Sequence, residues 1–189
     1  MTKKWSDGPR IVQYFHHAVF LKFMSQRRDT RRLAMQLLYQ FDQRGVADAE
    51  SILAGLDDGG DGAEVCQAAF ALAMAAWEGH GDADRIATCL APDWPTHRQP
   101  PVDRAIIRLA HHEMVTDHAP VGVAINEAVE LAKHYGAEHS SAFVNGVLDK
   151  MARQMVQESR EALTHKNKTS ENLQSHRAQE QERSHSEKQ

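Results

Sequence analysis

The fold is decided by residues 120–150, PVGVAINEAVELAKHYGAEHSSAFVNGVLDK. Apolar residues recur at helical spacing in the first half, and Pro120 suits a first helical turn because its missing N–H would be unpaired there anyway. Gly136 is expected to end this helix in the left-handed conformation of a C-cap. Ser140 or Ser141 can cap a second helix, so the pattern predicts two antiparallel helices joined by a tight turn. The faces expected to be buried are Val121, Ala124, Ile125, Ala128, Val129, Leu131 and Ala132, then Phe143, Val144, Val147, Leu148 and Met151.

The composition favours an all-helical protein. The chain has 189 residues, which suits one domain with extensions. Hydrophobic residues make up 41% but aromatic residues only 6%, and abundant alanine favours closely packed helices. No alternating run of Val, Ile, Thr and Tyr predicts a strand, and no apolar stretch is long enough to span a bilayer. Cys66 and Cys89 show no CxxC pattern and are expected to be buried thiols of a cytoplasmic protein.

Three segments are expected. Residues 25–160 form the helical domain and residues 1–24 an N-terminal extension; alternatively, the true start is Met24 and residues 1–23 do not belong to the protein. If they belong to the protein, Tyr14–Phe23 can form a short helix that docks on the domain. Residues 11–24 include two histidines and a lysine and lack a small-residue cleavage site, so they do not read as a signal peptide. Residues 161–189 are polar and are predicted to be disordered.

Helices are expected at about 28–44, 63–78 and 82–90, with another starting at Pro101. Trp94, in a proline-rich loop, is expected to fill the junction between the two halves of the fold. Residues 57–62, DDGGDG, read as a flexible loop because they lack the spacing of a calcium site. The predicted core faces are Ala34, Leu37, Leu38 and Phe41, then Val65, Ala69, Leu72, Ala73 and Ala76, then Ile86 and Leu90, then Val102, Ile106, Leu109, Ala110 and Met114.

Two residues of the 120–150 hairpin break its apolar pattern. Asn126 is expected to satisfy hydrogen-bonding groups at the seam between the two helices. Gly146 costs about 1 kcal/mol relative to alanine inside a helix, so close packing is expected to compensate. Both residues are therefore predicted to lie at a helix–helix contact.

Charge is distributed unevenly along the chain. Residues 1–32 carry a net charge of +6, residues 33–160 carry −10, and residues 161–189 are neutral. Four arginines, at 27, 28, 31 and 32, crowd the start of the first expected helix, where cations oppose the helix macrodipole. Local stability does not explain them, whereas a guanidinium fork suits phosphate. The pattern suggests a polyanion partner; the alternative is a solvated basic tail.

Nothing in the sequence argues for catalysis, a metal or a cofactor. The adjacent histidine pairs, His16-His17 and His111-His112, point about 100° apart on a helix and do not converge as ligands. The chain contains no phosphate-binding loop, no GxSxG nucleophile elbow and no GxGxxG dinucleotide fingerprint. Glu113 and Glu127 could face one another, but carboxylates on packed helices more often form pairs or caps. We therefore expect a protein that is not an enzyme.

A family resemblance covers roughly residues 27–153. The run AINEAVELAKHYG followed by FVNGVLD resembles the signature of the NusB family, and two further runs, RRDTRRLAMQLLYQFD (Arg27–Asp42) and PVDRAIIRLAHHEM (Pro101–Met114), match in order and spacing. The resemblance implies an all-α bundle of two small helical subdomains. It also implies transcription antitermination: binding of boxA RNA in ribosomal operon leaders with NusE, a small-subunit ribosomal protein, and assembly with RNA polymerase, so that rRNA transcription is promoted.

The resemblance also implies site residues. The RNA-binding positions would be Arg27, Arg28, Arg31, Arg32, Tyr39, Phe143 and Lys150. Asp103 and Glu113 would face NusE. His139 and Asp29 depart from the family pattern, and core packing is the alternative role for Tyr39 and Phe143.

Two other functions remain open at this point. The chain could be a non-catalytic protein-interaction module that lacks RNA binding. It could instead be an accessory RNA-binding domain related to those of rRNA cytosine methyltransferases, although about 30 residues after the last expected helix leave no room for a cofactor-binding domain. RNA binding measured with and without NusE separates these functions.

Overall fold

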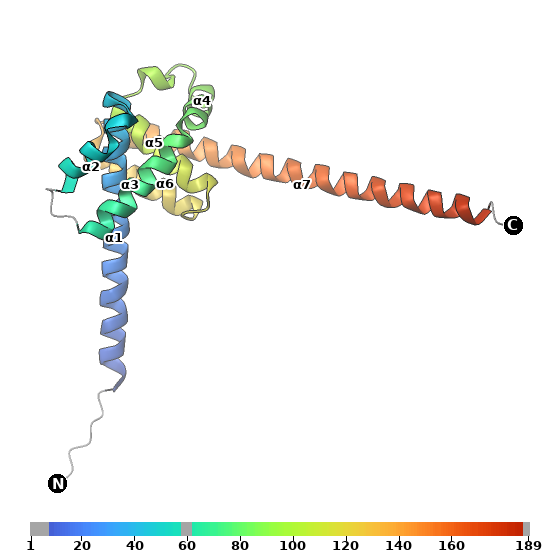
Figure 1. Cartoon of the computed structure of the whole chain (residues 1–189), viewed down its shortest axis with the longest axis horizontal. Coiled ribbons are helices and arrows are strands. Elements are labelled where there is room, and N and C mark those ends of the chain that lie inside the picture. Colours follow the sequence, from blue (N-terminus) through green and yellow to red (C-terminus); the bar gives the residue numbers. More distant parts are fainter. Residues whose placement is uncertain (1–7, 58–61, 187–189) are drawn as a thin grey trace, which may run out of the picture. The chain divides into compact units, whose positions relative to one another are not determined.

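The computed structural model describes the backbone of residues 8–57 and 62–186, and side chains over 26–164 except 50, 53, 56–61 and 163. Within these ranges every regular element is helical, so the all-α prediction is confirmed (Figure 1). Short 3₁₀ turns lie at Val46–Asp48 and Thr96–Arg98. The α-helices are α1 (Gly8–Arg44), α2 (Ala49–Asp57), α3 (Ala63–Glu78), α4 (His80–Leu90), α5 (Pro101–Val115), α6 (Val121–Tyr135) and α7 (Ser140–Ser186).

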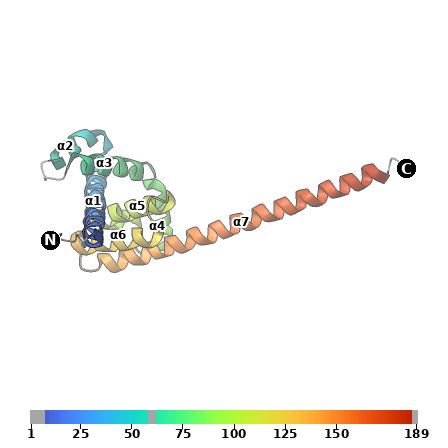
Figure 2. The same cartoon turned by 90° about the horizontal axis from the view of Figure 1, so that it is seen from below.

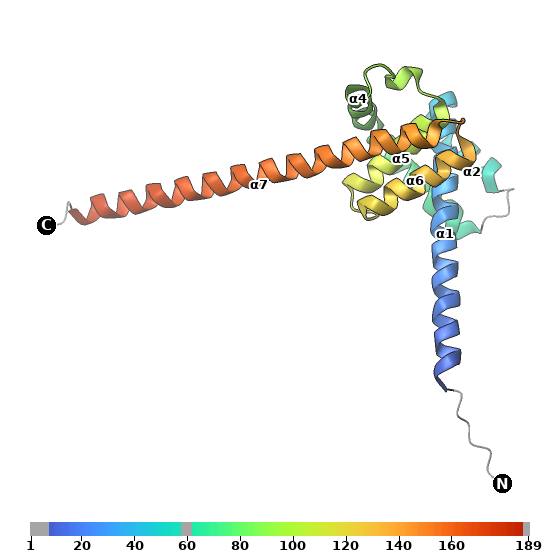
Figure 3. The ribbon, with the colours of Figure 1, turned by 180° about the vertical axis from the view of Figure 1, so that it is seen from behind.

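The chain divides into two compact units, Met1–Asp149 and Lys150–Gln189, which we describe separately. In the first unit, α1 packs against α3 and α5 (Figure 2). Helix α6 lies alongside α5 (Figure 3). Most of the expected DDGGDG loop lies outside the described residues.

Helix α5 is the centre of the first unit. It contacts α1, α3, α4 and α6, and is buried over most of its surface rather than along one stripe. Of its predicted core residues only Val102 is half-exposed. Because α5 is enclosed, several of its polar side chains also lie inside, namely Asp103, Arg108, His111 and Glu113.

The predicted core faces of α1 and α3 are confirmed, and that of α6 needs correction. All nine predicted residues of α1 and α3 are buried. In α6 the fully enclosed apolar residues are the alanines at 124, 128 and 132, whereas Val121 is exposed and Ile125 is half-buried. Small side chains let α6 approach its neighbours closely, so its larger apolar residues lie at the edges of the contact.

The turn between α6 and α7 uses Gly136, but not for the predicted reason. Gly136 has φ −88° and ψ −179°, which is extended rather than left-handed. Glycine is required because an added Cβ would lie 2.6 Å from the carbonyl oxygen of Ala132 and would collide with the Cβ of Ser140. The Ser140 hydroxyl accepts a hydrogen bond from the Ala137 N–H at 2.8 Å and donates one to Asp103 at 2.8 Å, so it fastens the turn to α5.

Other predictions about packing were wrong. Helix α4 buries Ala83 and Ala87, whereas Ile86 and Leu90 are half-exposed. Trp94 is 42% exposed and lies under Arg98 instead of filling a junction. Cys89 is exposed, although Cys66 is buried as predicted.

Trp77 contributes the aromatic packing that was expected of Trp94. Its ring meets Phe41 edge to face at 5.8 Å and stacks on His80 at 4.3 Å between centroids. The guanidinium of Arg108 lies 5.4 Å from the same ring centroid. Trp77 therefore joins α1, α3, α4 and α5.

Asn126 and Gly146 are both exposed, so neither lies at a helix–helix contact as predicted. No neighbouring atom lies within 4 Å of a Cβ built on Gly146. The apolar periodicity correctly predicts that these residues are helical, but it does not show that they face away from the contact between the helices.

Within the described residues, the first and last helices extend beyond their predicted ranges. Helix α1 is continuous from Gly8, and the side chains of the expected docking helix, Tyr14–Phe23, lie outside the described set. Helix α7 extends to Ser186, through a segment that was expected to be disordered. No glycine or proline follows Gly146, so nothing interrupts the helix.

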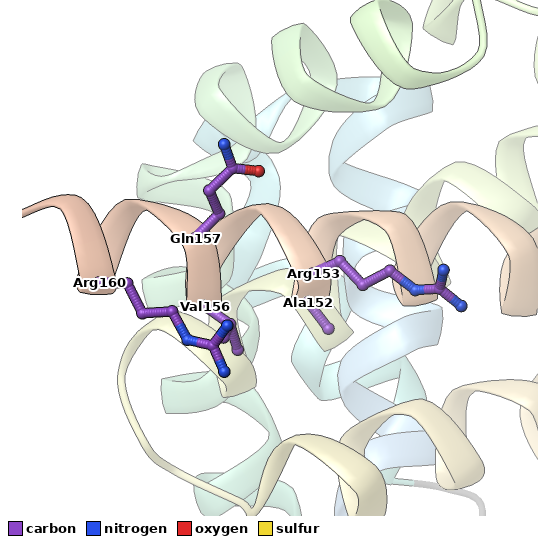
Figure 4. A pocket seen from close by; sticks show the side chains of 5 residues that line it. All are labelled: Ala152, Arg153, Val156, Gln157 and Arg160. Carbon is purple, nitrogen blue, oxygen red and sulfur yellow. The ribbon is translucent and has the colours of Figure 1, made fainter.

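As far as the structure describes it, the second unit consists of the part of α7 from Lys150 to Ser186. Amide–carboxylate pairs four residues apart support it: Gln154 donates to Glu158 at 2.8 Å and Gln157 donates to Glu161 at 2.9 Å. Figure 4 shows a pocket along this helix, lined by Ala152, Arg153, Val156, Gln157 and Arg160. Across the part of the chain that the structure describes, no helix is long and apolar enough to cross a membrane.

Candidate nucleic-acid interface

The four arginines of the RRDTRR run differ in their surroundings. Arg27 and Arg28 are exposed, Arg32 is half-buried and Arg31 is buried. Helical geometry places Arg28, Arg32 and Tyr39 on one face of α1, because positions four and eleven residues apart nearly coincide around the axis. The run therefore supplies both an exposed basic group and an internal one.

Arg31 forms a buried ion pair with Glu113 of α5. Its Nε donates to Oε1 at 2.9 Å and to Oε2 at 3.1 Å, and the side chains are 7% and 2% exposed. Each charge needs the other, because an unpaired charge is very costly at such a site. Neither side chain reaches solvent, so we leave Arg31 out of the RNA-binding set and Glu113 out of the partner-binding set.

Arg28 forms the exposed counterpart of this pair, with Glu127 of α6. Its Nε lies 3.4 Å from both carboxylate oxygens, but the side chains are 65% and 9% exposed. The two terminal amino groups of Arg28 make no hydrogen bond to any side chain that the structure describes. Arg28 thus contacts Glu127 through its Nε edge, while most of its side chain is exposed to solvent.

The charges around Arg28 come from one face of α6. Glu130 lies one turn beyond Glu127 and accepts a hydrogen bond from Lys133 at 2.7 Å. This hydrogen bond and the charge of Lys133 lower the pKa of Glu130, and Arg28 adds a smaller contribution in the same direction. Arg28 is therefore close enough to both glutamates to interact with them.

The aromatic candidates are placed differently from the arginines. Tyr39 and Phe143 are both half-buried. Phe143 belongs to the first turn of α7, after the turn held by Gly136 and Ser140. Lys150 is exposed, but it belongs to the second unit and is described apart from the arginines.

Asp103, the other expected partner-binding residue, is buried at the start of α5. Its Oδ2 accepts the Ser140 hydroxyl at 2.8 Å, while its Oδ1 has no hydrogen-bond partner among the described atoms. Burial raises the pKa of Asp103, and the hydrogen bond from Ser140 offsets this only in part. An enclosed carboxyl group does not present a surface to a partner, so we also leave Asp103 out of the interface.

Sequence reasoning missed an ionic network, centred on the buried Arg108, that joins α1, α4 and α5. Arg108 donates to Asp42 at 2.8 Å and to both oxygens of Asp84 at 2.8 and 2.6 Å, and Arg104 also pairs with Asp42. Burial would raise the pKa of Asp42, but hydrogen bonds from Arg104 and Arg108 outweigh it and lower that pKa. The signal was present, since arginines on an otherwise apolar helix must find partners.

The described side chains do not assemble a metal site: they include no group of three or more His, Cys, Asp or Glu placed to hold an ion. His111 and His112 are adjacent on α5, and burial lowers the pKa of both. The domain offers an exposed cationic group at Arg27 and Arg28 and two half-buried aromatic residues, Tyr39 and Phe143. Such an arrangement can bind a nucleic acid.

Comparison with known proteins points in the same direction. The family model described as the NusB family matches residues 28–153. A transcription antitermination protein NusB from Chloroflexus aggregans is 38% identical over 131 residues, which is 68% of this chain and 87% of that protein.

Two solved structures share the fold. The structure of T. maritima NusB has a TM-score of 0.60 and 33% identity, covering 67% of this chain and 90% of that one. A crystal structure of the antitermination factors NusB and NusE in complex with dsRNA has a TM-score of 0.60 and 25% identity, covering 69% of this chain and 98% of the matched chain.

Proposed function

This chain belongs to the NusB family, and from that premise we propose that it binds boxA-type leader RNA of ribosomal RNA operons together with NusE. In this role it is a non-catalytic transcription antitermination factor that promotes rRNA transcription. The observation that carries the proposal is the exposed guanidinium group of Arg28, presented beside Arg27 on a domain that is otherwise acidic. The related NusB–NusE complex with RNA supports both partners.

The proposed RNA contacts divide by chemistry. Arg27, Arg28 and Arg32 engage phosphates, and Lys150, which belongs to the other unit, is a separate candidate for a phosphate contact. Tyr39 and Phe143 offer ring surface on which unpaired bases stack. Both residues are half-buried, which is compatible with a partly exposed ring.

The charge distribution gives the complex a direction. Residues 33–160 carry a net charge of −10, which disfavours RNA binding at places other than the arginines. The same charge leaves an acidic surface for a basic ribosomal protein. We place NusE on that surface without assigning it to Asp103 or Glu113, because both carboxyl groups are buried. The RNA–NusE assembly would then join transcribing RNA polymerase in the cytoplasm.

The test is RNA binding measured by fluorescence anisotropy, with and without NusE. A boxA RNA is compared with a scrambled RNA of the same length, for wild type and for Arg27→Ala/Arg28→Ala. We expect weaker boxA binding by the variant and a slope of log affinity against log salt that flattens by about 0.7 per lost phosphate contact.

The matched control is Arg85→Ala, which removes an exposed arginine of α4 that pairs only with the exposed Asp82 among the described residues. Its affinity should equal that of wild type. Equal affinity of wild type for boxA and scrambled RNA, or an unchanged affinity in the double variant, would contradict the proposal. Binding of NusE without any binding of RNA would favour a protein-interaction module instead.

A further inference from the structure

We infer that Glu127 is a positioning residue for RNA binding: it holds Arg28 by the Nε edge so that the two terminal amino groups meet one RNA phosphate. The inference rests on the proposed RNA-binding function and adds a residue that does not itself touch RNA. It gives a role to a carboxylate that would otherwise only repel the ligand.

The geometry assigns Glu127 to Arg28. Glu127 lies on the enclosed side of α6, between the buried Ala124 and Ala128, and its side chain is 9% exposed. Both of its oxygens are 3.4 Å from the Nε of Arg28, and no other ion pair of Glu127 is present among the described side chains. A carboxylate this enclosed needs a cation, and Arg28 supplies it.

The chemistry of the guanidinium group allows one arginine to serve two anions. Its N–H donors lie in one plane and point in different directions, so the Nε edge can face a carboxylate while the terminal pair faces a phosphate. A lysine ammonium is a point charge and has no such division. Glu127 at the Nε edge therefore leaves free the end that suits a bidentate phosphate contact.

Ordering Arg28 in advance favours binding. A long, exposed side chain samples many rotamers, and fixing it only when RNA arrives costs binding free energy. The charge of Glu127 opposes phosphate, but Arg28 lies between the two anions and solvent screens their repulsion. We expect the gain in order to exceed the repulsion.

A double-mutant cycle tests this balance. RNA affinity is measured for the full-length wild type, Glu127→Gln, Arg28→Ala and the double variant, with a boxA RNA as the probe. We expect Glu127→Gln to weaken binding by about three- to tenfold, as when one long side chain must be ordered on binding. In the Arg28→Ala background the same change should have an effect below about twofold.

Glu130→Gln is the matched control, because it removes a neighbouring charge of α6 that hydrogen-bonds Lys133 rather than Arg28. Its RNA affinity should stay equal to that of wild type or rise slightly. The positioning role is contradicted if Glu127→Gln binds RNA as well as wild type or tighter. It is also contradicted if Glu130→Gln weakens binding equally, or if Glu127→Gln has the same effect without Arg28.

A readout without RNA separates this inference from the proposed function. In the ¹H–¹⁵N spectrum, the Nε–H signal of Arg28 should exchange slowly with water in wild type and quickly in Glu127→Gln.

Arg28→Lys provides a second test if Glu127→Gln does not fold. This variant should bind RNA nearly as weakly as Arg28→Ala, and wild-type affinity would overturn the inference. Loss of affinity in Arg28→Ala without loss in Glu127→Gln removes only the positioning role, whereas absence of RNA binding by wild type removes the proposed function.

Discussion

Two arginine–glutamate pairs on α1, one turn apart, show how burial divides a single sequence run into structural and binding residues. Arg31 and Arg28 both direct Nε toward a glutamate, Glu113 and Glu127 respectively. The Arg31 pair has distances of 2.9 and 3.1 Å and is enclosed, whereas the Arg28 pair is at 3.4 Å and its arginine is largely in solvent. The inner pair therefore stabilises the domain, and the outer one leaves a guanidinium group available to a ligand.

Removal of the inner arginine should have the largest effect. Arg31→Ala leaves Glu113 buried without its cation, and we expect the free energy of unfolding to fall by about 3–5 kcal/mol. Urea unfolding followed by circular dichroism measures the loss. The comparison is Arg28→Ala, which also leaves a glutamate without its cation but removes a largely exposed arginine at the longer distance of 3.4 Å, so we expect a clearly smaller loss than in Arg31→Ala.

A compensating pair checks the cause of that loss. If the unpaired charge is responsible, Arg31→Leu/Glu113→Leu should regain most of the stability lost in Arg31→Ala, because apolar side chains can replace a buried ion pair. A double variant as unstable as the single one would show that packing around Arg31, rather than its charge, holds α1 to α5. Equal losses in Arg31→Ala and Arg28→Ala would remove the distinction between the pairs altogether.

The turn that leads to Phe143 is fastened to the buried Asp103 of α5. A methyl group in this turn, in Gly136→Ala, should cause the next largest loss of stability. The new methyl group would lie 2.6 Å from the carbonyl oxygen of Ala132 and would displace Ser140. We expect a loss of about 1–3 kcal/mol, typical of overpacking a close contact. Thermal unfolding measures it, at about 2–4 °C per kcal/mol for a chain of this size. An unchanged melting temperature would mean that the turn relaxes at no cost.

The sequence predicts the fold through periodicity. Faces such as Ala34, Leu37, Leu38 and Phe41 follow from the helical spacing of apolar residues alone, and they are buried. The four arginines also stood out, because local helix energetics do not explain them. Residue type and spacing along the chain are enough to predict these core faces and to single out the arginines.

Periodicity does not say which neighbour a polar residue meets. Arg28 and Arg31 are the same type of residue and lie one turn apart on α1. Only the positions of α5 and α6 decide that Arg31 is internal and Arg28 is exposed. For the same reason the predicted seam position of Asn126 is wrong, since Asn126 is exposed. These contacts depend on tertiary packing between segments far apart in the sequence. Gly136 is a different case, because its constraint comes from Ala132 and Ser140, four residues away on either side.

The buried carboxyl group of Asp103 predicts a pH dependence for the enclosed side. Burial raises its pKa in the folded state above the value of about 3.9 in the unfolded chain. The folded state therefore binds the proton more tightly, so this group favours folding at low pH and that contribution is lost as the pH rises through the folded-state pKa. Asp103→Asn cannot titrate, and its stability relative to wild type should increase from pH 4 to pH 7.

Asp42 provides the opposite case for the same titration. Arg104 and Arg108 lower its pKa against the effect of burial, so its contribution is present above the unfolded-state pKa and is lost as the pH falls through the folded-state value. Asp42→Asn should therefore lose stability relative to wild type as the pH rises. Urea unfolding at several pH values checks both slopes; parallel curves for wild type and Asp103→Asn would contradict the assignment of a raised pKa.

A methyl group at the exposed Gly146 should raise stability, whereas the same change at Gly136 should lower it. Gly146 lies inside α7 with no neighbour within 4 Å of an added Cβ, so Gly146→Ala gains helix propensity without a clash. We expect a stabilisation of about 0.5–1 kcal/mol, measured as a higher melting temperature. Destabilisation would reveal a contact at this surface. Because Gly136→Ala makes the same chemical change, opposite signs for the two variants would show that burial, not residue type, separates the structural and the accessible sides of this domain.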